Sequence, residues 1–289
     1  MRAKALVAAG LVGLMACAAA TAAGKALLLR YKYKPGAVDK YVMKGGFTTS
    51  LVREGPTHQV GEKATLDAKL TVKTTAVNAA GAASQELSVD RMEMTARGTK
   101  IVFEHGKATI LVNGKPLKTP PKQYEKMLGE PVKVQVDSRG AVVKSGAAAS
   151  RGPSSAFDPA QFQHMTVVFP QGAVAPGRKW SGSIKLPTGE GAAVAVDFSY
   201  RFVGTERYNG TEVARINVSG TGKLQEATGG KPPVESVKQN LNGYELFDYK
   251  AGRVSYINWK VQQVVTRAAG EKQQPVTAIM NGEIEVARQ

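Results

Sequence analysis

The stretch that decides the fold is 241–266, which reads LNGYELFDYKAGRVSYINWKVQQVVT. In its second half Ile257, Trp259 and Val261 alternate with polar residues. This two-residue period, in residues that favour pleated backbone, predicts a half-buried strand. The first half is equally rich in aromatic residues, and Gly252 lies between the halves in a position suited to a tight turn. The stretch therefore predicts a long β-hairpin.

The same pattern recurs along the chain, with alternating runs separated by turns that contain glycine. Within 241–266, the pair Gln262-Gln263 interrupts the alternation and predicts a bulge or a twist. Asn113-Gly114 is typical of a type I′ hairpin turn. The expected strands cover 27–34, 39–53, 62–76, 84–96, 101–104, 109–112, 131–144 (as a hairpin), 166–169, 179–186, 192–203, 212–224, 237–249, 253–267 and 275–286.

The fold class is therefore mainly β, with long antiparallel strands in curved sheets or half-barrels and one or two short helices. One helix is expected at 120–128, where prolines suit the first turn, and a shorter one near 158–164. The division expected is a first β unit at 24–145, a loop or linker at 146–160 and a second β unit at 161–289. A weak internal echo favours two similar units, and one continuous, strongly bent sheet is the alternative.

The N-terminus has the pattern of a secretory signal. Residues 1–23 combine a short basic start, an apolar run and small residues before Ala22. The run is too short to span a bilayer comfortably, so a membrane anchor is the less favoured alternative. Two processing routes stay open, namely cleavage after Ala22 or lipidation of Cys17, which is the one cysteine of the chain and follows Leu14-Met15-Ala16. The protein is expected to be periplasmic or extracellular, with membrane contact only if Cys17 is lipidated.

The charge is strongly basic, at a formal +16 over the whole sequence. The lysines are dispersed along the expected strands, so one interpretation is a solvated face that protects strand edges. The other is attraction to an anionic envelope polymer or lipid headgroups. Nucleic acid is not an expected partner, since the chain carries no basic and aromatic motif of a known reader.

No catalytic, metal or cofactor motif is found, so the protein is not expected to be an enzyme. The sequence lacks a His-x-x-x-His pair, a Gly-x-Ser-x-Gly elbow and a phosphate-binding loop. Pairs of acids that converge only in three dimensions stay open, namely Glu283 with Glu285 and Glu245 with Asp248. The histidines lie in separate segments, at His58, His105 and His164.

Four segments carry a resemblance to known proteins: YKYKPG at 31–36, 132–143 around Gly140, VFP at 168–170 and PGRKW at 176–180. Together with the signal, they resemble a family of exported bacterial β-rich proteins of unknown function. The architecture also resembles the half-barrel lipoprotein carriers of the bacterial envelope, at the level of the fold. The resemblance implies an envelope location and assigns no functional residue.

The leading hypothesis is a non-enzymatic exported envelope protein that binds a lipid or other hydrophobic ligand on a curved sheet. The residues expected to line that face are Tyr200, Phe202, Tyr256 and Trp259. The alternative interpretation is that these four side chains fill a closed hydrophobic core and contact no ligand. The alternative function is a structural or adaptor protein that binds a protein partner or an anionic envelope polymer through its basic faces.

Overall fold

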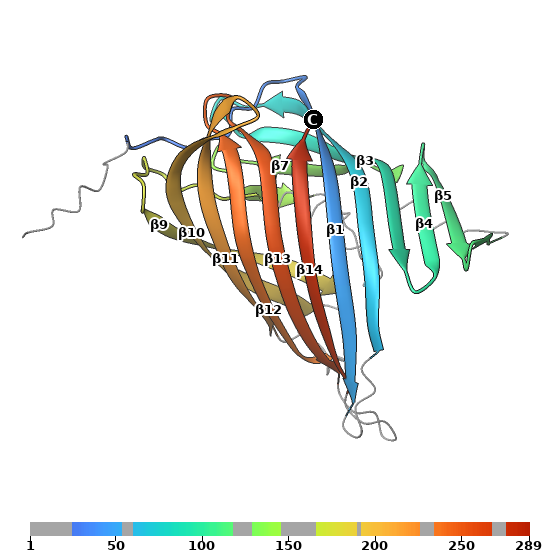
Figure 1. Cartoon of the computed structure of the whole chain (residues 1–289). Coiled ribbons are helices and arrows are strands. Elements are labelled where there is room, and N and C mark those ends of the chain that lie inside the picture. Colours follow the sequence, from blue (N-terminus) through green and yellow to red (C-terminus); the bar gives the residue numbers. More distant parts are fainter. Residues whose placement is uncertain are drawn as a thin grey trace, which may run out of the picture.

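The computed structural model describes residues 25–53, 60–117, 129–145, 166–189, 192–225, 234–267 and 276–289. Most of these residues belong to one curved, open antiparallel sheet (Figure 1). In chain order its strands are β1 (Val38–Arg53), β2 (Val60–Val77), β3 (Ala83–Ala96), β4 (Thr99–Glu104), β5 (Lys107–Val112), β6 (Lys115–Pro116), β7 (Val132–Val136), β8 (Val142–Ser145), β9 (Lys179–Gly189), β10 (Ala192–Tyr208), β11 (Thr211–Gln225), β12 (Val234–Asp248), β13 (Arg253–Arg267) and β14 (Val276–Arg288).

The sheet consists of two runs of sequential neighbours that meet where β1 pairs with β14. The strand order is β6-β5-β4-β3-β2-β1-β14-β13-β12-β11-β10-β9, and the β7–β8 hairpin pairs with the first half of β3. Strands on both sides of 146–160 are thus hydrogen-bonded into the same sheet. The division of the chain into two units stays a prediction.

The predicted mainly β, curved antiparallel architecture is confirmed, and most of the expected strands are present. Two expected strands are wrong, at 27–34 and 166–169, which are irregular apart from a bridge between Leu27 and Val174. The reason is that their backbone groups bond to loops at the sheet's end, as when Tyr31 N–H donates to Ser138 O at 2.8 Å. The signal, Cys17, both expected helices and the 146–160 linker lie outside the described residues.

The hairpin at 241–266 forms as predicted from β12 and β13. Gly252 has a φ of +71° and lies against Lys32, so a side chain there would be strained and would meet the N-terminal segment. No bulge forms at Gln262-Gln263, because both residues pair in regular register, and the alternative of a twist there stays a prediction. The irregularity lies instead near Ser255, where the partners shift from Leu246↔Tyr256 to Phe247↔Val254.

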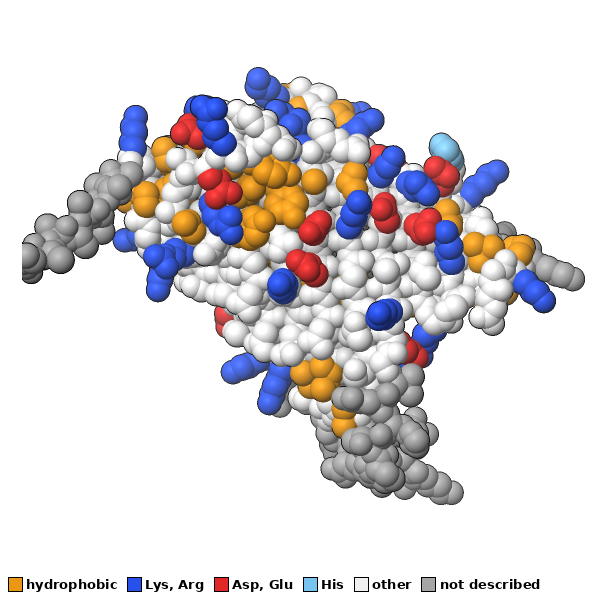
Figure 2. Space-filling model, viewed as in Figure 1, with side chains coloured by type: hydrophobic (Ala, Val, Ile, Leu, Met, Phe, Trp, Pro, Cys, Tyr) orange, Lys and Arg blue, Asp and Glu red, His pale blue; other side chains and the backbone are white. Residues whose placement is uncertain are grey.

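Alternation along the strands gives the sheet an inner face, which carries the buried core, and an outer face, which is largely exposed. On β7, for example, Val132 and Val134 are buried while Lys133 and Gln135 are exposed. Figure 2 views the molecule from the same side as Figure 1, where Lys and Arg are scattered over the surface and not gathered into one patch. The core therefore lies within the curve of the sheet.

Large aromatic side chains on the inner face lie against glycines of the neighbouring strand. Gly243 pairs with Trp259, and a Cβ at Gly243 would meet Asn258 O and, at 2.8 Å, the Trp259 ring. Gly220 is placed similarly, since its Cβ would meet the Phe198 ring at 3.1 Å. These close approaches need residues without side chains. They place the Trp259 and Phe198 rings directly on the backbone of the curved sheet.

Candidate ligand-binding face

One end of the inner face is covered by two irregular segments, 25–37 and 166–178. They are joined by reciprocal backbone bonds between Leu27 and Val174, both at 2.9 Å. The first segment is also tied to the β12–β13 turn, where Lys32 N–H donates to Gly252 O at 3.0 Å. Backbone N–H and C=O groups in these irregular segments thus find hydrogen-bond partners in each other and in the β12–β13 turn.

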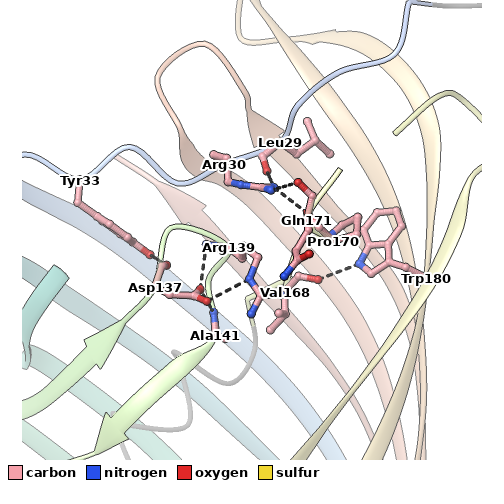
Figure 3. A network of polar contacts seen from close by, with 10 residues as sticks. All are labelled: Leu29, Arg30, Tyr33, Asp137, Arg139, Ala141, Val168, Pro170, Gln171 and Trp180. Atoms are coloured by element: carbon pink, nitrogen blue, oxygen red, sulfur yellow. Dashed lines mark hydrogen bonds and ion pairs between the residues drawn. The ribbon is translucent and has the colours of Figure 1, made fainter. Parts of the chain in front are cut away.

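Figure 3 shows the polar contacts that fasten these segments. The Arg30 guanidinium donates to Pro170 O at 2.7 Å and also contacts Gln171 O. Trp180, on β9, donates from its indole Nε1 to Val168 O at 2.8 Å. The 166–178 segment is therefore held from one side by the N-terminal segment and from the other by the edge strand of the sheet.

Beneath these contacts lies an aromatic cluster, defined as Tyr31, Phe169 and Phe247. Phe247 is fully buried, with ring centroids 5.0 Å from Tyr31 and 4.6 Å from Phe169. Tyr31 and Phe169 are themselves 5.4 Å apart. One residue of the sheet thus contacts both covering segments, and aromatic pairs of this geometry add to the stabilisation from burial alone.

Glu245 is a completely buried carboxyl beside this cluster. Its Oε2 accepts a hydrogen bond from Val167 N–H at 3.1 Å, and its Oε1 has no hydrogen-bond partner among the described residues. Burial raises the pKa of Glu245 to about 8, and the Val167 bond opposes this shift only in part. Near neutral pH the group is therefore mostly protonated, which avoids leaving a bare charge in the core.

The alternation of the strand was enough to predict the burial of Glu245 from the sequence. Glu245 has the same parity as Leu241 and Phe247 on β12, so alternation places it on the apolar face. Sequence reasoning treated Glu245 only as half of an acid pair with Asp248. Asp248 instead caps the β12–β13 turn, where its Oδ1 accepts Ala251 N–H at 2.8 Å. The structure does not bring these two acids together.

Of the four aromatic residues expected to line a ligand face, three share the inner face and one does not. Tyr200, Phe202 and Trp259 are only 3%, 1% and 4% exposed, so in this structure they belong to the core. Tyr256 lies on the outer face, because it is three residues from Trp259 on the same strand. Its ring contacts Tyr208 and Tyr244, with centroids 5.6 and 5.9 Å away. The expectation that all four share one surface is therefore wrong.

The second candidate acid pair, Glu283 and Glu285, lies on the outer face. Both side chains are exposed, and Asn258 Nδ2 donates to Glu283 at 2.9 Å and to Glu285 at 3.5 Å. Over the described ranges, no group of three or more His, Cys, Asp and Glu side chains could hold a metal ion. The described part of the chain also contains no helix with the length and apolar character needed to cross a membrane.

Away from the covering segments, the inner face stays apolar and includes partly exposed side chains. Side chains from five strands are partly exposed here while still packed against the core, namely Leu66, Ile184, Leu224, Val265 and Ile284. Their neighbours Val194 and Val237 are buried, so burial is mixed in this part of the sheet. The part that carries the partly exposed side chains is named the lower inner face.

Comparisons with known proteins leave the chain without an assigned family. No family model matches, and no curated protein matches by sequence. Among solved structures, a lipovitellin structure on lipid–protein interactions has a TM-score of 0.44 at 11% identity, over 89% of this chain and 25% of that chain. This chain therefore spans about a quarter of the lipovitellin chain.

Two further solved structures are less similar. DynF from the dynemicin biosynthesis pathway of Micromonospora chersina gives a TM-score of 0.23 at 8% identity, over 92% of this chain and 86% of that chain. An outer membrane channel from Pseudomonas putida F1 gives 0.22 at 10% identity, over 89% of this chain and 97% of that chain. These TM-scores are too low to assign a function.

Proposed function

We propose that the protein is a non-enzymatic, exported protein of the cell envelope that binds a lipid or other hydrophobic ligand against the lower inner face. The observation that carries the proposal is that apolar side chains of five strands remain partly exposed inside the curve of the sheet. Apolar surface left accessible to water is costly, and an apolar ligand that covers it gains about 25 cal/mol for each Å² buried. Concave apolar faces are the usual form of such sites.

The closed end of the inner face supports the same proposal. The covering segments and the aromatic cluster tie one end of the sheet together, and we expect these contacts to preserve the curvature around the lower inner face. A preformed site binds with a smaller entropic cost than one that must be ordered by its ligand. In this arrangement Tyr200, Phe202 and Trp259 form the floor that supports the site, and they do not contact the ligand directly.

A pair of neighbouring valines on β13 provides the sharpest test. Val265 faces the core and pairs with Val237, whereas Val264 is on the outer face and pairs with Ile279. We expect Val265→Asp to weaken binding of the hydrophobic fluorophore 1-N-phenylnaphthylamine at least about tenfold, because a carboxylate there must be desolvated by the ligand. Val264→Asp carries the same chemical change one residue away, and we expect it to bind the fluorophore normally.

The measurement is a fluorescence titration of the mature protein, with circular dichroism of each variant to verify the fold. Equal affinity for both variants, or an equal loss in both, would show that the fluorophore does not occupy the inner face. Displacement of the fluorophore by phospholipid or by free fatty acid then separates the two ligand classes. Failure of every apolar competitor to displace it would also count against the proposal.

A further inference from the structure

The outer face of the sheet carries a groove that the proposed function does not use. Its volume is about 890 Å³, and it crosses six adjacent strands, from β10 through β11, β12, β13 and β14 to β1. In Figure 2 a white area, the colour of the backbone and of uncharged polar side chains, lies between two hydrophobic patches. Most lining residues of the groove are polar and exposed, and the inward-facing ones are Phe198, Gly220, Val261 and Gly282.

The strand register arranges these side chains in two parallel rows across the sheet. The first row joins Ser199, Ser219, Asn242, Lys260, Glu283 and Gly46 through successive cross-strand pairs. The second row joins Asp197, Thr221, Asn240, Gln262 and Asn281 in the same way. The rows are two residues apart along each strand, which is about 7 Å, and six strands span about 24 Å. The groove therefore offers a long, regular grid of polar groups.

The chemistry of the grid is that of neutral hydrogen bonding. Hydroxyl and amide side chains both donate and accept hydrogen bonds, and they make up half of the first row and most of the second. The charged members are two acids, Asp197 and Glu283, and one base, Lys260, so the groove has little net charge. An anionic polymer would gain little from such a surface, since its attraction depends on a clustered positive field.

An aromatic patch borders the groove on one side. Tyr244 is two residues beyond Asn242 on β12, and its ring lies 5.9 Å from that of Tyr256. The guanidinium carbon of Arg215 is 4.0 Å from the centre of the Tyr244 ring. Both tyrosines are half-buried, so each is partly exposed. The groove thus has polar groups along its length and partly exposed tyrosines at its border.

From these observations we infer that the outer-face groove binds an uncharged polysaccharide chain that lies across the strands. Sugar rings present hydroxyl groups that donate and accept, and apolar C–H faces that stack on aromatic rings. The amide and hydroxyl rows match the first property and the bordering tyrosines match the second. The elongated groove suits an extended chain better than a compact small molecule. The protein would then hold a glycan on its outer face, independently of any ligand within the curve.

The test uses the mature protein and three soluble probes: the hexamers of N-acetylglucosamine, of β-1,4-linked glucose and of α-1,4-linked glucose. We expect isothermal titration calorimetry to give a dissociation constant of about 1 mM or tighter for at least one of them. Asn240→Ala with Gln262→Ala should weaken that binding at least tenfold, and so should Tyr244→Ala. Thr109→Ala, an exposed position on β5 four strands away from β1, should leave it unchanged.

Two further readouts separate this site from the other surfaces. Binding should be insensitive to salt, whereas attachment of an acidic polymer through dispersed lysines would weaken as ionic strength rises. Val265→Asp should leave hexamer binding unchanged, so the glycan site and the hydrophobic site can fail separately. The inference is overturned if none of the hexamers binds, if the folded groove variants retain full affinity, or if binding is lost at high salt.

Discussion

We expect the unfolding free energy of the protein to decrease as the pH rises from 5 to 9, with Glu245 as a principal cause. Burial raises its pKa from an ordinary 4.5 to about 8, so the folded chain keeps a proton that the unfolded chain releases between these values. The stabilisation is complete below about pH 4.5 and is lost as the pH rises through about 8. The total change is roughly 3–5 kcal/mol, at about 1.4 kcal/mol for each pKa unit.

The variant Glu245→Gln isolates this contribution from every other titrating group. An amide of the same size can still accept the Val167 N–H bond through its oxygen, and it has no charge to desolvate. We expect the variant to have a flatter dependence of stability on pH and to be the more stable protein above pH 8. Urea unfolding at intervals of one pH unit measures both curves. Parallel curves for the two proteins would show that Glu245 does not titrate within the core.

The second large effect is expected for Phe247→Ala, with a loss of about 3–5 kcal/mol in unfolding free energy. Phe247 is fully buried and contacts both covering segments through Tyr31 and Phe169. The truncation leaves a cavity at the point where the sheet and both segments meet. Because the segments lose a shared contact, the 25–37 segment should also become easier to cleave with protease under native conditions.

Tyr208→Ala is the matched control for this truncation. Tyr208 also contacts another aromatic ring, that of Tyr256 at 5.6 Å, but it lies half-buried on the outer face. We expect its loss to cost about 1 kcal/mol and to leave the covering segments protected. Chemical denaturation of both variants measures the difference. Similar losses for the two would contradict the assignment of Phe247 as the residue that holds the closed end together.

Much of the fold could be predicted from the sequence because its strands alternate regularly. The parity of Ile257, Trp259 and Val261 located both the strand and its buried face, and the glycine turn located the hairpin. The segment at 27–34 alternates just as clearly, with Leu29 and Tyr31 buried, yet it is not a strand. Alternation reports which side chains face the core, but it does not report whether the backbone has a neighbouring strand to pair with.

The candidate sites were harder to predict, because each depends on the order of strands in the sheet. Nothing local indicates that β1 pairs with β14, and this pairing completes both the inner face and the outer groove. The error at Tyr256 has a simpler origin, since counting residues from Trp259 would have placed it on the opposite face. The closure over Glu245 depends on Val167, which is 78 residues away in sequence.

The central claim, a hydrophobic ligand held inside the curved sheet, is tested most directly by native mass spectrometry of the protein recovered from its own cell envelope. We expect an added mass that is released by organic solvent as a lipid. A denaturing spectrum of the same sample separates this bound lipid from acyl chains covalently attached to Cys17. A chain that carries no added mass, and that takes up none after incubation with phospholipid vesicles, would contradict the claim.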